Sequence, residues 1–470
     1  MITSLLIGLA ILAGLITIGW KITDLLIGRT SWALQFALAF PLGAGSFTYV
    51  LFLLSWAGVP LTPASVSLIY LVAVAGLFGL SALHGPSHEN WKSEATKGTT
   101  LFHSPLPQGL LIALLALVLL FDCVISVGQA YAAWDAVAMW GIKGYGIAME
   151  GSVFAGRSWG AHGLAYPFNI HLLVALFKML SGDPLPASKL IFPFFLISTV
   201  LGSFAFWTRR GVPREWASAG CLLLASVPVF FVHATNGYAN LATACYLVLA
   251  TFVGAEAVAS GSRGGQVLAG LLLGLACWTI VEGMFFAAAV LVSLVLARYL
   301  GSKGEIHWLH LSLPLAALGG IWLLFYGRYG ASGSQAMGAA HAMFASIRAG
   351  ELNLYAFRMI LGYLRRFVFD PSTWGVLFSA GFLMAIFGFR KLVFARDTVL
   401  TAAYLVILST GVVSSLLFYL RSFVSEDFYA YLIRGFPRES FQTAFLFAGV
   451  VVWASGAQLA GWLKGPSAEV

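Results

Sequence analysis

"QVLAGLLLGLACWTIVEGMFFAAAVLVSLVLARYL", residues 266–300, is apolar along almost its whole length and is charged only at Glu282 and Arg298. As one helix it would be about 52 Å long, because an α-helix rises 1.5 Å per residue. The hydrocarbon core of a membrane is only about 30 Å thick. We therefore expect two short spans, 265–281 and 283–299, which meet at Glu282. This arrangement places the carboxylate at a membrane surface or in a cavity.

Similar apolar runs occur from one end of the 470-residue chain to the other, and only 9% of its residues are charged. A soluble protein of this length would have about a quarter of its residues charged. The runs are solidly apolar and do not alternate, which argues against a transmembrane barrel. We expect an all-α integral membrane protein with about thirteen transmembrane helices and additional periplasmic interfacial helices. The expected spans are 2–20, 32–57, 63–83, 108–130, 184–207, 215–233, 238–258, 265–281, 283–299, 308–328, 374–390, 398–420 and 440–460.

The net charge of +8 comes mostly from Lys and Arg in short segments between spans, not from a contiguous basic stripe. This pattern argues against nucleic-acid binding and is typical of the positive-inside rule. All these basic segments fall on one side of the membrane if 166–181 does not cross it but is an interfacial helix that lies on the bilayer. The N-terminus is then outside, the C-terminus is cytoplasmic, and the segments 131–183, 234–237, 329–373 and 421–439 lie outside.

The clearest candidate site is the segment YAAWDAVAMWGIKGYG, residues 131–146, which follows the expected span 108–130. If the helix continues through it, Asp135 and Lys143 lie about 12 Å apart along its axis on a broad shared face. A carboxylate and a cation at this separation can contact different parts of one substrate. The alternative is an interfacial helix with an aromatic belt and outward-reaching charges. The residues alone favour neither.

Other polar side chains on the predicted outer face are candidates for substrate binding. His162 and Tyr166 follow in the same loop, although a lone histidine is more often structural. Asn236 and Asn240 open the span 238–258, where they either cap the helix or hydrogen-bond a polyol.

Glu282 and Arg434 are the charged candidates beyond the first outer loop. An isolated buried carboxylate such as Glu282 needs a partner, a proton or water, which favours a function for it. Arg434 lies in the last outer loop, where an arginine binds a substrate phosphate or, alternatively, a lipid headgroup. No His, Cys and Asp cluster has convincing metal-ligand spacing. We expect no required cofactor, while a divalent metal remains compatible with the sequence.

Four blocks of sequence resemble those of a known family in their order and spacing. They are WDAVAMWGIK (134–143), AYPFN (165–169), HATNGYANLATACYLVLA (233–250) and GLACWTIVEG (274–283). The set is similar to polytopic bacterial GT-C glycosyltransferases, the relatives of protein O-mannosyltransferases and aminoarabinose transferases. The resemblance covers residues 108–300 and weakens afterwards. We accordingly expect N-terminal spans and a cytoplasmic loop in 1–107, a catalytic core in 108–300, and C-terminal spans in 301–470.

The resemblance implies transfer of a sugar from a polyprenyl-phosphate donor to a glycan, lipid or protein acceptor at the outer face of the cytoplasmic (inner) membrane. By analogy, Asp135 occupies the place of the catalytic base, and displacement is direct and inverting. Asn240 departs from the family pattern, which commonly has Asp there, and this weakens a two-carboxylate mechanism. The substrate-binding candidates are Lys143, His162, Tyr166, Asn236, Asn240, Glu282 and Arg434.

Three other functions fit parts of the sequence. A secondary transporter would use Glu282 and Asp122 as coupling sites for an ion or proton, although the unequal loops on the two faces argue against it. An O-antigen-ligase-like enzyme also uses lipid-linked glycans, but it relies on arginine and histidine in one large outer loop. A purely structural subunit would leave Asp135 and Glu282 without a role.

Overall fold

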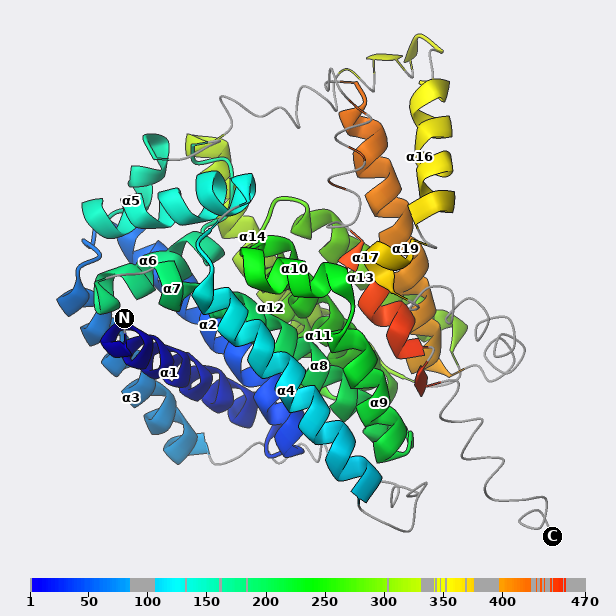
Figure 1. Ribbon diagram of the computed structural model, residues 1–470, viewed down its shortest axis with the longest axis horizontal. Helices are drawn as coiled ribbons and strands as arrows, with labels where there is room; N and C mark the ends of the chain where they lie inside the picture. Colours follow the sequence, from blue (N-terminus) through cyan, green and yellow to red (C-terminus); the bar gives the residue numbers. More distant parts are fainter. Residues whose placement is uncertain are drawn as a thin grey trace.

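The protein is an all-α multi-pass membrane protein (Figure 1). The computed structural model describes residues 2–84, 106–131, 133–159, 163–182, 185–301, 304–330, 353–367, 370–375 and 397–423, together with short stretches within 342–350 and 428–453. Among these residues, nine helices are long and apolar enough to cross a membrane. They are α1 (Ile2–Ile27), α2 (Trp32–Trp56), α3 (Pro63–His84), α4 (Leu106–Gly128), α8 (Ile191–Arg209), α11 (Ala239–Ser260), α13 (Gly283–Leu300), α14 (Trp308–Tyr329) and α19 (Thr398–Arg421).

These nine helices coincide with nine of the expected spans. The expected span 215–233 is divided into α9 (Arg214–Ala225) and α10 (Pro228–Asn236), which are bent by 61°. Pro228 explains the break, because proline lacks an N–H group and restricts the residue before it. The expected span 265–281 is α12 (Arg263–Cys277), which has only 15 residues. Most of 374–390 lies outside the described residues, and 440–460 is described only in part, as far as residue 453.

Successive helices end alternately at two faces of the bundle. At one face Arg210 pairs with Asp397. At the other, the backbone N–H of Val153 donates to Ser55 Oγ at 3.0 Å, and Glu282 pairs with Arg421. We call the second face the outer end. It carries the segment between α4 and α8, the start of α11 and the break between α12 and α13; the name follows the charge pattern, from which we expect these segments outside the membrane.

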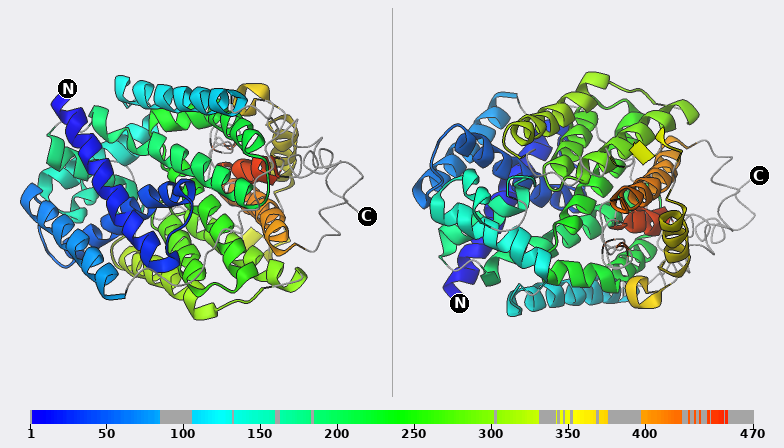
Figure 2. Two further views of the ribbon diagram at one scale, coloured as in Figure 1. Left: turned by 90° about the horizontal axis from the view of Figure 1, so that it is seen from below. Right: turned by 90° about the horizontal axis from the view of Figure 1, so that it is seen from above.

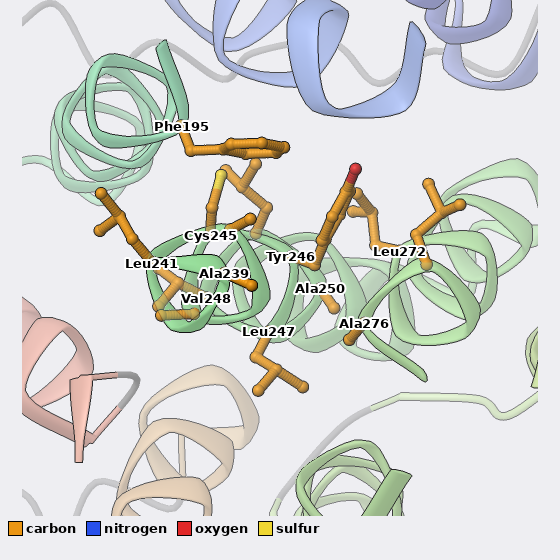
Figure 3. Packing of buried hydrophobic residues seen from close by; sticks show 14 of the residues in the cluster. Phe195, Ala239, Leu241, Cys245, Tyr246, Leu247, Val248, Ala250, Leu272 and Ala276 are labelled. Carbon is orange, nitrogen blue, oxygen red and sulfur yellow. The ribbon is translucent and has the colours of Figure 1, made fainter. Parts of the chain in front are cut away.

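Helix α11 is almost wholly enclosed by the protein, whereas α3, in blue, and α4, in cyan, lie at the edge of the bundle (Figure 2). Nearly every side chain from Ala239 to Val258 is buried. Figure 3 shows the packing around α11, with the Tyr246 hydroxyl pointing away from the helix axis. This hydroxyl donates to the carbonyl oxygen of Pro41 in α2 at 2.9 Å. The bond ties the central helix to the helix pair α1–α2.

Two glycines allow α1 and α2 to approach closely. A Cβ atom on Gly19 would overlap the backbone of Ala39, and one on Gly43 would overlap the backbone of Leu15. Small residues at helix–helix contacts are a principal way to pack membrane helices, because apolar side chains gain little by leaving lipid. The N-terminal helix is therefore a packed part of the fold.

Two expectations about the outer end are wrong. The helix predicted over 166–181 is α6 (Asn169–Ser181), whose residues 169–177 are all buried. It cannot lie on the bilayer surface, because α5 (Ile142–Glu150), α1 and α2 pack around it. The segment 131–146 does not continue α4 either. Helix α4 ends at Gly128, and a new helical element starts at Asp135.

Candidate active site

The candidate active site is built on a π-helix, η1 (Asp135–Gly141), which runs directly into α5. π-Helical turns are rare and occur frequently at functional sites. Asp135 is in the first turn and is partly exposed, while the preceding Trp134 is 63% exposed. The expected carboxylate therefore lies in a partly exposed π-helical turn at the outer end.

Lys143 does not share this exposed position. Its side chain is completely buried, and among the described residues its Nζ atom has no hydrogen-bond partner. The stem packs beside Gly156, where a Cβ atom would be 3.5 Å from Lys143 Cδ. Burial lowers the pKa of Lys143 to about 8. The ammonium is thus enclosed by the protein in this structure, and the contact of Lys143 with a substrate stays a prediction from the sequence.

Aromatic and imidazole rings pack together at Trp140, in the π-helix η1. The Trp140 ring centroid lies 5.9 Å from that of Tyr166 and 5.0 Å from that of His171. His171 Nδ1 lies 2.9 Å from the carbonyl oxygen of Pro167. Burial, followed by the nearby Lys143 charge, lowers the pKa of His171 well below its ordinary value. Tyr166 is partly exposed and remains a candidate for substrate contact.

Two of the recognised sequence blocks meet in a buried polar network around Asn169. Thr48 Oγ1 donates to Asn169 Oδ1 at 2.8 Å, and Asn169 Nδ2 donates to Thr279 Oγ1 at 2.9 Å. Trp278 Nε1 donates to Thr48 Oγ1 at 3.3 Å. Asn169, Thr279 and Trp278 thus hold α6 and α12 against α2.

Glu282 lies at the break between α12 and α13, as the sequence predicts. Gly283 permits this break, because a Cβ atom there would overlap the carbonyl oxygen of Ala276. The Glu282 carboxylate is 9% exposed and accepts a hydrogen bond from the guanidinium of Arg421, at the end of α19. The partner that a buried carboxylate requires is therefore a cation of the same chain. Arg421 ends α19 and begins the segment 421–439, which we expect outside from the charge pattern, but nothing in the sequence pairs the two residues.

The remaining predicted residues are dispersed. Asn236 is the last residue of α10, and Asn240 is the second residue of α11. The N-cap of α11 is Tyr238, so the capping interpretation of both asparagines is wrong. Both are partly exposed at the outer end. His162 and Arg434 lie outside the described residues.

One buried residue at this end was missed by the sequence analysis. Lys189 lies inside the expected span 184–207. A lone lysine in an apolar run could have been recognised as a site with a specific role, because ionisable residues within membrane spans are rare and costly. It precedes α8 and is fully buried. Among the described residues, no group of three His, Cys, Asp or Glu side chains could hold a metal ion.

Comparison with known proteins gives a likeness in structure alone. No family model matches the chain, and no curated protein matches its sequence. The chain is similar to the oligosaccharyltransferase of Archaeoglobus fulgidus in complex with Zn and sulfate, with 16% identity over 74% of this chain and 49% of that chain and a TM-score of 0.40. It is similar to the same organism's oligosaccharyltransferase AglB with an inhibitory peptide and a dolichol-phosphate, with 14% identity over 74% and 51% and a TM-score of 0.38.

The chain spans about half the length of these proteins. A likeness at this TM-score assigns neither a family nor an activity. The function is therefore argued below from the chain's own residues.

Proposed function

We propose that the protein is a membrane glycosyltransferase of the GT-C kind. It transfers a sugar from a polyprenyl-phosphate-linked donor to an extracytoplasmic acceptor, at the outer end defined above. One observation carries the proposal. Of the three carboxylates that the sequence singles out, Glu282 is paired with Arg421 and Asp122 is 1% exposed within α4, whereas Asp135 is partly exposed in a π-helical turn at the outer end.

Asp135 acts as the general base in this proposal. A sugar or other hydroxyl group is a poor nucleophile at neutral pH, and a carboxylate within about 3 Å of it accepts its proton as the attack on the anomeric carbon proceeds. The C–O bond to the lipid phosphate breaks in the same step, so the configuration inverts and no glycosyl-enzyme forms. The polyprenyl tail stays in the bilayer, which requires the base to stand at the membrane boundary.

The leaving phosphate needs a cation, and the side chain of the predicted contact Lys143 is buried in this structure. Arg434 remains a predicted contact from the sequence. Among the described residues, Arg157 is exposed at the outer end, with its guanidinium 5.2 Å from the Phe154 ring centroid and 5.6 Å from that of Tyr329. A guanidinium held over two rings is preorganised for binding a phosphate. We assign Arg157 and Arg434 as the candidate phosphate ligands.

The test is transfer by purified protein in lipid nanodiscs, with a panel of polyprenyl-phosphate hexoses and pentoses as donors and release of polyprenyl phosphate as the signal. Asp135→Asn should lower the rate by about a hundredfold or more, the loss expected for a missing general base. Asp122→Asn is the matched control and should leave the rate close to that of the unaltered protein. Near-normal transfer by Asp135→Asn would remove Asp135 from the mechanism.

A secondary transporter is the second candidate, and one observation favours it. Both carboxylate oxygens of Asp122 are buried and lack a hydrogen-bond partner among the described residues. Asp122 lies in α4, which packs against the bent pair α9 and α10, and broken helices beside an intramembrane carboxylate are typical of ion-coupled transporters. Ion- or potential-dependent uptake into proteoliposomes that is lost in Asp122→Asn, together with absent transfer, would establish this function instead.

A further inference from the structure

A single buried lysine holds the turn that leads from α4 to the proposed base. Lys189 Nζ donates to the carbonyl oxygens of Gln129, at 2.8 Å, and of Ala130, at 3.2 Å. These carbonyls follow the last turn of α4, where helix geometry leaves acceptors without intrahelical partners. A lysine ammonium at a helix C-terminus is favoured by the helix dipole as well as by the two hydrogen bonds.

The side chain of Tyr131 is fixed at the same place. Its ring centroid is 5.5 Å from Lys189 Nζ, and its hydroxyl is 3.2 Å from Ser188 Oγ. The ring also packs on Gly237, where a Cβ atom would come within 2.7 Å of the ring. Gly237 also has a φ of 88°, a conformation that glycine adopts readily. The turn 129–131 is therefore clamped between the start of α8 and the start of α11.

Lys189 is in turn held from α4. Ser126 Oγ donates to the Lys189 carbonyl oxygen at 3.0 Å. The connection between α4 and α8 thus runs in both directions, from the lysine side chain to the end of α4 and from α4 to the lysine backbone. These hydrogen bonds fix the position of the end of α4 relative to the start of α8. Moving either helix would leave buried polar groups without partners, which is costly.

We infer that Lys189 is a positioning residue for Asp135. It fixes the turn 129–131 and thereby the point from which η1 starts, four residues beyond Tyr131. The inference rests on the proposed function for its catalytic consequence, but the positioning itself is a property of the fold. A displacement of about 1 Å in a catalytic group costs about a hundredfold in rate, so a small release of this turn is sufficient to be measured.

The experiment compares Lys189→Met with Lys189→Arg and with the matched control Lys178→Met. Lys178 also bonds a carbonyl beyond a helix C-terminus, that of Gly182 at 2.6 Å, but it lies at the surface and on α6. The first readout is the mobility of a spin label attached through Trp134→Cys, on a background in which Cys123, the one cysteine that is not fully buried, is replaced by Ala. The second readout is kcat and KM for sugar transfer.

We expect the label to become mobile in Lys189→Met, to regain most of its order in Lys189→Arg, and to be unchanged in Lys178→Met. We expect kcat to fall by about a hundredfold in Lys189→Met, with KM changed less than threefold. If Lys189→Met does not fold, Lys189→Gln, which keeps a neutral donor, should show intermediate mobility. An ordered label and normal kcat in a folded Lys189→Met or Lys189→Gln would overturn the inference.

The two readouts also separate this inference from the proposed function. Increased label mobility in Lys189→Met, with no transfer even by the unaltered protein, would support the positioning role and remove the glycosyltransferase assignment. Loss of transfer in Asp135→Asn, with an ordered label and normal kcat in Lys189→Met, would support the glycosyltransferase assignment and remove the positioning role of Lys189.

Discussion

The buried Lys143 makes the stability of the protein depend on pH in a predictable direction. The ordinary pKa of a lysine is 10.5, and burial lowers the pKa of Lys143 to about 8. Below pH 8 the ammonium is charged in both the folded and the unfolded protein. Between pH 8 and 10.5 it is neutral when folded and protonated when unfolded, so the unfolded state binds more protons. The free energy of unfolding therefore rises with pH across this interval.

The size of the effect follows from the same values. The interval from about 8 to 10.5 corresponds to about 3 kcal/mol. We expect Lys143→Met to be more stable than the unaltered protein at pH 7 by an amount of this order, because methionine fills the buried space without a charge. The advantage should shrink steadily from pH 8 to pH 10.

The assay is unfolding in detergent micelles, followed by tryptophan fluorescence, for both proteins at pH 7, 8, 9 and 10. The difference between the two proteins isolates Lys143 from all other titrating groups, including its neighbour His171, which burial keeps neutral throughout this range. Parallel profiles for the two proteins, or a difference that grows with pH, would show that the ammonium has a partner or reaches water, and would refute the reasoning.

Three further predictions concern the packing that supports the site. Asn169→Leu breaks a buried network with bonds of 2.8 and 2.9 Å and should lower the free energy of unfolding by about 2–4 kcal/mol, measured with denaturant. Gly283→Ala should lower the melting temperature, because the new Cβ atom meets the Ala276 carbonyl oxygen at a steric cost of about 1–3 kcal/mol. The control Gly320→Ala should not lower it, because a Cβ atom there meets no atom within 4 Å. Equal effects of the two substitutions would contradict the close contact at Gly283. Glu282→Gln and Arg421→Gln should each lower the free energy of unfolding. A double-mutant cycle should give a coupling free energy between the two residues of about 1 kcal/mol or more. Strictly additive effects would mean that the ion pair is not formed.

Much of the architecture could be predicted from the sequence, because a segment that crosses the lipid bilayer must be a helix of about 20 mostly apolar residues. Long apolar runs become spans, and the expected break at Glu282 is present because a helix as long as the apolar stretch 266–300 would exceed the thickness of a membrane. The bend at Pro228 and the shortness of α12 were not predicted, since both depend on how neighbouring helices pack. A hydropathy pattern does not contain that information.

The site was harder to predict because burial decides the role of each polar group. Asp135 and Lys143 are eight positions apart in sequence, yet the first is partly exposed and the second is enclosed by α6 and Gly156. Asn169 and Thr279, in two of the recognised blocks, stabilise the core. Arg421 is one of many basic residues in outer loops, and only the fold brings it to Glu282.

The most direct test of the account is the structure of the protein with a polyprenyl phosphate bound in a lipid nanodisc. We predict that the phosphate lies at the outer end, with the Asp135 carboxylate facing it across a space large enough for one sugar. A phosphate bound at the opposite face of the bundle, or an Asp135 carboxylate turned towards lipid with no space beside it, would contradict the proposed function.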